Sequence, residues 1–171
     1  AAEGMRAAAD GGAGPWFVAT CCFGMGSVEL RRGDFPAAIA LLERALDLCQ
    51  GHRLQSWFPS ISASLGYAYV HAGRAAEGAA LLEQSTEHAE RMHLRASYSM
   101  WLTYLGDACS SLGRPAEARR AAQAALDHAR EYGERGHEAW ALFLLASVEA
   151  RTESVNATAV EGLFDPAIDL A

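Results

Sequence analysis

The chain of 171 residues contains no lysine. Several catalytic mechanisms depend on the ammonium group of that side chain, among them the phosphate-binding loop of nucleotide hydrolases, Schiff-base chemistry and the serine–lysine dyad. The sequence also lacks a Gly-x-Ser-x-Gly elbow and a complete Gly-x-Gly-x-x-Gly loop. We therefore expect a protein that is not an enzyme, with no catalytic residues and no cofactor.

An excess of basic charge and a long apolar run are missing as well. Fourteen arginines stand against 21 acidic side chains, which leaves a net charge of −7. An acidic chain is poorly suited to bind a phosphate backbone or an anionic bilayer. The longest apolar stretch, residues 139–148, is about half of the roughly 20 residues that a membrane helix needs. We expect no nucleic-acid partner and no membrane segment.

The four cysteines do not form a recognisable framework. Cys21 and Cys22 are adjacent, the other two are isolated, and no Cys-x-x-Cys pair is present. This pattern favours neither disulfides nor a structural zinc site, so we expect no metal and a reducing, cytoplasmic setting. Two of the six histidines, His88 and His128, lie 40 residues apart. They are expected to pack at helix ends, with a metal or pH-sensing role as the alternative.

Internal repeats explain most of the sequence. Residues 26–33, 66–73 and 106–113 align without gaps, and each segment begins and ends with glycine. The period is therefore 40 residues. A weaker fourth copy begins near residue 145 but lacks the glycine of its turn. Repeats of this length indicate stacked supersecondary units.

Each repeat is predicted to contain two helices. In the second copy, apolar residues follow helical spacing over residues 57–72 and again over residues 75–89,. Gly73 separates the two segments, and glycine commonly ends a helix because it accepts the left-handed conformation. Gly66 lies within the first helix, opposite the small Gly78 of the second, so the two helices should approach closely. Strand patterns are absent, and the 36 alanines favour helices,. The sequence predicts an all-α array of hairpins.

These residues resemble the tetratricopeptide repeat (TPR) family. The positions that carry the resemblance in the second copy are Leu65-Gly66-Tyr67-Ala68-Tyr69, Gly73, Gly78, Leu82 and Ser85. The third copy repeats them at Leu105-Gly106, Gly113, Ala118, Ala122 and Ala125. The family's usual period is 34 residues, so these repeats are longer. The resemblance implies a TPR-like α-α superhelix, a right-handed solenoid of about four helical hairpins.

A narrower resemblance concerns the parent protein. Residues 37–49 and 134–142 are similar to the long repeats of MalT-like transcription regulators and of multidomain bacterial adenylate/guanylate cyclases. It implies that the chain is a fragment of a larger bacterial signalling protein whose ATPase module lies elsewhere.

The repeats divide the chain into five segments. A tail of a preceding repeat with its loop is followed by three regular repeats and a divergent, truncated fourth, at residues 1–14, 15–54, 55–94, 95–134 and 135–171. In the last segment, we expect Leu163, Phe164, Ile168 and Leu170 to form the apolar stripe of a second helix, left open without a following hairpin. Because such patches tend to find a partner, we expect a homodimer formed through the C-terminal hairpin.

The family resemblance also implies where a partner binds. In TPR arrays the first helix of each hairpin lines a concave groove, and the lining positions are carried over by counting from the mid-helix glycine. They are Phe23, Ser27, Arg31, Tyr67, His71, Thr103, Asp107, Ser111, Phe143, Ser147 and Arg151. Aromatic anchors among polar groups suit a protein or peptide segment. Members that clamp a C-terminal carboxylate use asparagine and lysine here, and this chain has neither at the matching positions.

Two functions remain open at this point. The first is a regulatory module that binds a protein or peptide segment, either from another molecule or from another domain of the parent chain. The alternative is the small-ligand sensor of a MalT-like regulator, with Tyr67, His71 and Asp107 as polar contacts.

Overall fold

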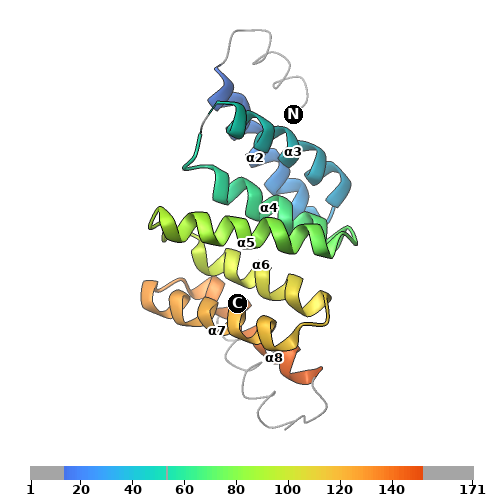
Figure 1. The fold of residues 1–171 in the computed structure, drawn as a ribbon, viewed down its shortest axis with the longest axis vertical. Helices are drawn as coiled ribbons and strands as arrows, with labels where there is room; N and C mark the ends of the chain where they lie inside the picture. The colour runs from blue at the N-terminus through green and yellow to red at the C-terminus, as the bar shows by residue number, and fades with distance from the viewer. Residues whose placement is uncertain (1–13, 53, 152–171) are drawn as a thin grey trace. The chain divides into compact units, whose positions relative to one another are not determined.

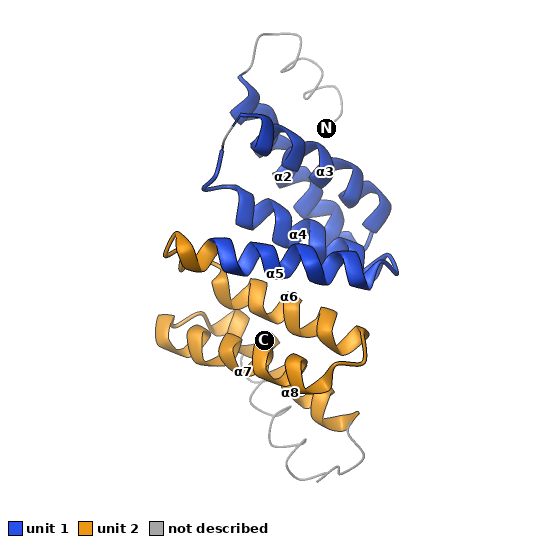
Figure 2. Ribbon diagram, viewed as in Figure 1, with its two compact units in different colours: residues 1–88 blue, residues 89–171 orange. Residues whose placement is uncertain are grey.

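The computed structural model describes residues 14–52 and 54–151, and these residues form helices joined by short turns (Figure 1). The helices are α2 (Pro15–Arg32), α3 (Phe35–Gly51), α4 (Phe58–His71), α5 (Ala75–Arg91), α6 (Tyr98–Ser111), α7 (Pro115–Tyr132) and α8 (Arg135–Ala150). The chain separates into two compact units, residues 1–88 and residues 89–171 (Figure 2). The boundary falls within α5, and each unit has its own core.

Local sequence sets where the helices begin and end. Pro15 and Pro115 stand at the first positions of α2 and α7, where the missing N–H has no intrahelical partner to lose,. The turns of the three hairpins are made by glycines with φ of 77°, 83° and 70°, at Gly33, Gly73 and Gly113. The left-handed turns predicted from the repeat are therefore confirmed.

In unit 1, α2 packs against α3, and α3 packs against α4. One buried cluster contains Leu42 of α3 together with Leu65 of α4. The helices α4 and α5 approach each other closely at two glycines. A Cβ atom added at Gly78 would lie 2.5 Å from the Gly66 carbonyl oxygen and 2.7 Å from Val70 Cγ2. The close approach predicted for these two glycines is therefore confirmed.

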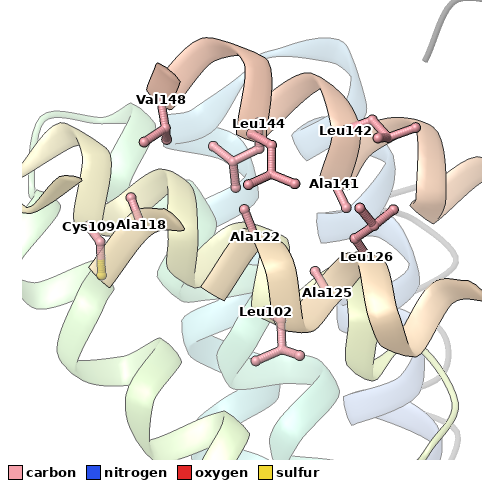
Figure 3. Packing of buried hydrophobic residues seen from close by; sticks show 11 residues of the cluster. Leu102, Cys109, Ala118, Ala122, Ala125, Leu126, Ala141, Leu142, Leu144 and Val148 are labelled. Carbon is pink, nitrogen blue, oxygen red and sulfur yellow. The ribbon is translucent and has the colours of Figure 1, made fainter. Parts of the chain in front are cut away.

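In unit 2, α7 packs against both α6 and α8. Small residues of one helix face large residues of the other: Figure 3 shows Leu144 of α8 pointing towards Ala122 of α7, and Ala141 of α8 beside Leu126 of α7. A Cβ atom at Gly106 would lie 2.6 Å from Leu144 Cδ2 and 3.2 Å from the carbonyl oxygen of Ala118. The glycine of the third copy is therefore also a position without room for a side chain.

The prediction of an all-α array of hairpins is confirmed. The helices expected over residues 57–72 and 75–89 are α4 and α5, with ends within two residues of those predicted. No described helix is long and apolar enough to cross a membrane. Residues 1–13 and 152–171 lie outside the described residues, so the homodimer expected through Leu163, Phe164, Ile168 and Leu170 stays a prediction.

Candidate functional site

The predicted lining residues lie on α2, α4, α6 and α8, except Arg151, which directly follows α8. Within unit 1 they come from α2 and α4, which contact each other, and within unit 2 from α6 and α8, which also contact each other. We call the first group the unit 1 face: Phe23, Ser27, Arg31, Tyr67 and His71. We call the second group the unit 2 face: Thr103, Asp107, Ser111, Phe143, Ser147 and Arg151.

Aromatic contacts hold the unit 1 face in place. The ring of Tyr67 meets the ring of His71 edge-on, with centroids 4.3 Å apart. The His71 ring also stacks on Phe35 of α3, at 5.2 Å and 14°. Phe23 is half-buried and meets Trp57 edge-on at 5.9 Å. These rings are fixed by packing, so they lose little side-chain entropy when a partner binds.

The remaining members of the unit 1 face are more polar. Arg31 is exposed at the end of α2. The Ser27 hydroxyl donates a hydrogen bond to the backbone carbonyl of Phe23 in the same helix, 2.8 Å away.

The unit 2 face is dominated by Phe143, whose residue surface is 57% exposed. No other large hydrophobic side chain of the described residues is as exposed. Ser147, one turn later, donates a hydrogen bond to the Phe143 carbonyl at 2.8 Å. The guanidinium of Arg151 donates to Ser110 Oγ at 3.1 Å and so joins the end of α8 to α6.

The other predicted members of this face differ in access. Ser111 is exposed and Asp107 half-buried. Thr103 is only 8% exposed, and its hydroxyl donates to the carbonyl of Ser99 at 2.9 Å. The structure therefore leaves a partner little of Thr103 to touch.

Sequence reasoning missed a polar cluster in unit 2. The Ser99 hydroxyl donates to the Glu134 carboxylate, and His137 Nδ1 lies 3.2 Å from the same oxygen, Glu134 Oε2. His128 Nδ1 lies 3.8 Å from it. Burial acts to raise the pKa of Glu134, but the hydrogen bonds from Ser99 and His137 and the nearby His128 outweigh it, so this pKa lies below its ordinary value,.

This cluster has the residue types of a hydrolytic triad but not its geometry. In a triad the imidazole bridges serine and carboxylate through its two different nitrogens. Here Ser99 Oγ and Glu134 Oε2 both lie near Nδ1 of His137, at 3.0 and 3.2 Å. Ser99 is also fully buried. The arrangement joins the start of α8 to α6 rather than activating a nucleophile.

Only one contact of this cluster could be predicted from the sequence. Glu134 and His137 are three residues apart, a spacing that brings side chains together on a helix. Ser99 is 35 residues away from Glu134 in the chain, and no motif links them. Only the packing of α6 beside the α7–α8 turn shows the contact.

The two periodic histidines pack at helix ends, as predicted. His88 lies against Phe58 with ring centroids 5.1 Å apart, and His128 lies against Tyr98 at 5.3 Å. Phe58 and Tyr98 are themselves one period apart. Over the described ranges, no group of three or more His, Cys, Asp or Glu side chains could hold a metal ion.

Comparison with known families identifies the repeats. Three segments match the tetratricopeptide repeat family, at residues 19–44, 59–84 and 102–124. They fall on the hairpins α2–α3, α4–α5 and α6–α7, so the TPR-like fold is confirmed. No curated protein matches the chain. Such repeats typically mediate protein–protein interaction without catalysis, but the match does not extend to MalT-like proteins in particular.

Proposed function

We propose that the chain is a non-catalytic interaction module that binds a protein or peptide segment through the unit 1 face and the unit 2 face. The observation that carries this proposal is the exposure of Phe143. Most of the apolar side chains of α8 between Ala139 and Val148 are buried, whereas Phe143 is 57% exposed. An exposed aromatic ring surrounded by polar groups has the composition of a binding hot spot.

The unit 1 face supports the same function in a different way. Its aromatic rings are half-buried or stacked, and Arg31 and His71 border them with exposed surface. Preordered rings with a polar rim favour recognition of a segment whose own apolar side chain can pack against Tyr67.

The finer assignment rests on the sequence. We propose that the module belongs to a larger bacterial signalling protein and regulates another domain of it, as the resemblance of residues 37–49 and 134–142 implies. Four free cysteines support a reducing, cytoplasmic setting,. The alternative, a small-ligand sensor, is supported by the contact between Tyr67 and His71. Its third residue, Asp107, belongs to the other unit.

Peptide selection tests the proposal. Phage-displayed random peptides are selected on the immobilised chain, and the affinity of each selected peptide is then measured for single variants. Phe143→Ala and Tyr67→Ala should each weaken binding of peptides that use the corresponding face by about tenfold or more, as for hot-spot residues.

A matched control uses another exposed apolar side chain. Met92 is 38% exposed and belongs to neither face, so Met92→Ala should leave the affinities unchanged. If every selected peptide were insensitive to both face variants and sensitive to Met92→Ala, binding through the two faces would be wrong.

A further inference from the structure

A pocket of about 250 Å³ lies in unit 2, and none of its lining residues belongs to the unit 2 face. It is bordered by the end of α5 and the turn that follows, the start of α6 and the end of α7. The lining residues are Ala89, Glu90, His93, Leu94, Arg95, Tyr98, His128 and Tyr132. The volume is below the roughly 300–1,000 Å³ of pockets for drug-sized ligands, so it suits a small metabolite.

The walls of this pocket carry two opposite charges. Glu90 accepts a hydrogen bond from the Tyr98 hydroxyl, and the Arg95 guanidinium lies 5.5 Å from the centre of the Tyr132 ring. Both side chains line the pocket, yet among the described residues neither has an ion-pair partner. Two unneutralised opposite charges around one small space are complementary to a zwitterion.

Aromatic rings form another part of the wall. The His128 ring lies 4.5 Å from the ring of Tyr132 at 37°, and 5.3 Å from the ring of Tyr98 at 64°. Three neighbouring rings favour a planar, apolar group in the pocket, because aromatic pairs contribute beyond the area that they bury. A ligand that satisfies both features has two opposite charges and a flat side chain.

Comparison of the repeats shows that the hairpin fold does not require these charges. One period earlier, Gln50 and Gln55 stand at the positions of Glu90 and Arg95. Likewise Phe58 and Met92 stand at the positions of the two tyrosines. Helices end and begin there in the same way without either charge or either hydroxyl. The carboxylate of Glu90 and the hydroxyl of Tyr98 are therefore features of this one copy, whereas the arginine recurs one period later as Arg135.

The backbone conformation of the turn also supports a ligand site in this pocket. His93 has a φ of 53°, a left-handed conformation, and the residue one period later with the same conformation is Gly133, with a φ of 68°. A side chain at such a position has a steric cost that glycine avoids. His93 lines the pocket. The strained backbone conformation therefore occurs at a position where the side chain could contact a ligand.

We infer that this pocket binds a small aromatic α-amino acid in its zwitterionic form. The carboxylate pairs with Arg95, the ammonium group pairs with Glu90, and the ring packs against His128 and Tyr132. The inference does not depend on the proposed function, because the pocket and the two faces share no residue.

Fluorine NMR of the intact chain tests the inference, with L-4-fluorophenylalanine as the probe. Two analogues keep the ring but lose one charge each: 4-fluorophenethylamine lacks the carboxylate, and 3-(4-fluorophenyl)propionate lacks the ammonium group. The amino acid should bind, and each analogue should bind about tenfold or more weakly, as expected for the loss of one charged hydrogen bond. Equal affinities for the three compounds, or no binding of the amino acid at millimolar concentration, would overturn the inference.

Two substitutions test which side chain binds which charge of the ligand. Each replaces a charged residue by the glutamine that stands one period earlier. Arg95→Gln should abolish the preference for the amino acid over 4-fluorophenethylamine, and Glu90→Gln should abolish its preference over the propionate. Arg135→Gln is the matched control, since Arg135 stands one period after Arg95, is exposed and does not line the pocket. Preferences retained in both pocket variants, or lost in the control, would show that the probe binds elsewhere.

Discussion

Glycines within helices set the distance between neighbouring helices in this protein. Gly66 and Gly78 are buried where α4 and α5 meet, and a methyl group at either position would contact the other helix closer than normal packing allows. Glycine within a helix costs about 1 kcal/mol relative to alanine. That cost is offset because the two backbones can pack closely.

A pair of identical substitutions tests this account at single residues. Gly78→Ala should destabilise the chain by about 1–3 kcal/mol through overpacking against the Gly66 carbonyl and Val70,. Gly24→Ala, at an exposed position of α2 with no atom within 4 Å of an added Cβ, should stabilise it by about 0.5–1 kcal/mol,. Chemical denaturation of both variants measures the two effects. Equal changes of the same sign would show that helix propensity, rather than helix contact, decides them.

Residue patterns predicted the glycine positions but not the charged pocket. Gly73 and Gly66 recur at a fixed period and have backbone roles, which a sequence repeat displays directly. Glu90 departs from the repeat, whereas Arg95 recurs as Arg135, and the role of both residues depends on which turns and helix ends share a pocket with them. Such a departure is visible in the aligned copies, but only the fold shows that the two residues border one space.

At the scale of elements, the start of α8 depends on one carboxylate. Glu134 immediately precedes α8 and accepts hydrogen bonds from Ser99 of α6 and from His137 of α8 itself. Hydrogen bonds to an ionised, mostly buried carboxylate are among the stronger ones in a protein. The ionised form of Glu134 therefore holds α8 against α6.

Because the ionised carboxylate of Glu134 holds α8 in place, the free energy of unfolding should depend on pH. The pKa of Glu134 lies below its ordinary value of 4.5, so its ionised form stabilises the fold above that pH,. The contribution is lost as the pH falls through the lowered pKa of the folded state. Glu134→Gln should destabilise the chain by about 1–3 kcal/mol at pH 7, and the difference from the unsubstituted chain should shrink below pH 4.5. Urea denaturation across this range measures it.

The control for this experiment is Glu87→Gln, a change at an exposed glutamate of α5. It should alter stability by less than about 0.5 kcal/mol at every pH. A difference for Glu134→Gln that stayed constant down to pH 3 would mean that the charge of Glu134 does not hold α8 in place.

The ends of the helices could be predicted from the sequence more closely than their contacts. Apolar spacing and terminal glycines placed α4 and α5 within two residues, because both signals are local,. The contact between Ser99 and Glu134 was not predictable, because it depends on how α6 packs beside a turn 35 residues later.

For the molecule as a whole, we propose that the first helices of the hairpins bind a partner and that the second helices support them. The exposure of large side chains supports this proposal. Phe143 of α8 is 57% exposed, whereas the interior-facing alanines of α7, such as Ala118 and Ala122, are fully buried. The alanines of α7 and the glycines within α4, α5 and α6 bring the helices together, and the most exposed aromatic side chains, such as Phe143, lie on the first helices.

Hydroxyl-radical footprinting of the chain with a selected peptide tests this claim most directly, because it reports the exposure of individual side chains. For a peptide that uses the unit 2 face, Phe143 should be oxidised more slowly in the complex than in the free chain. Tyr132 and Met92, 39% and 38% exposed and outside both faces, should be oxidised at unchanged rates. Protection of Tyr132 and Met92, with Phe143, Tyr67 and Phe23 all as reactive as in the free chain, would contradict binding through the first helices.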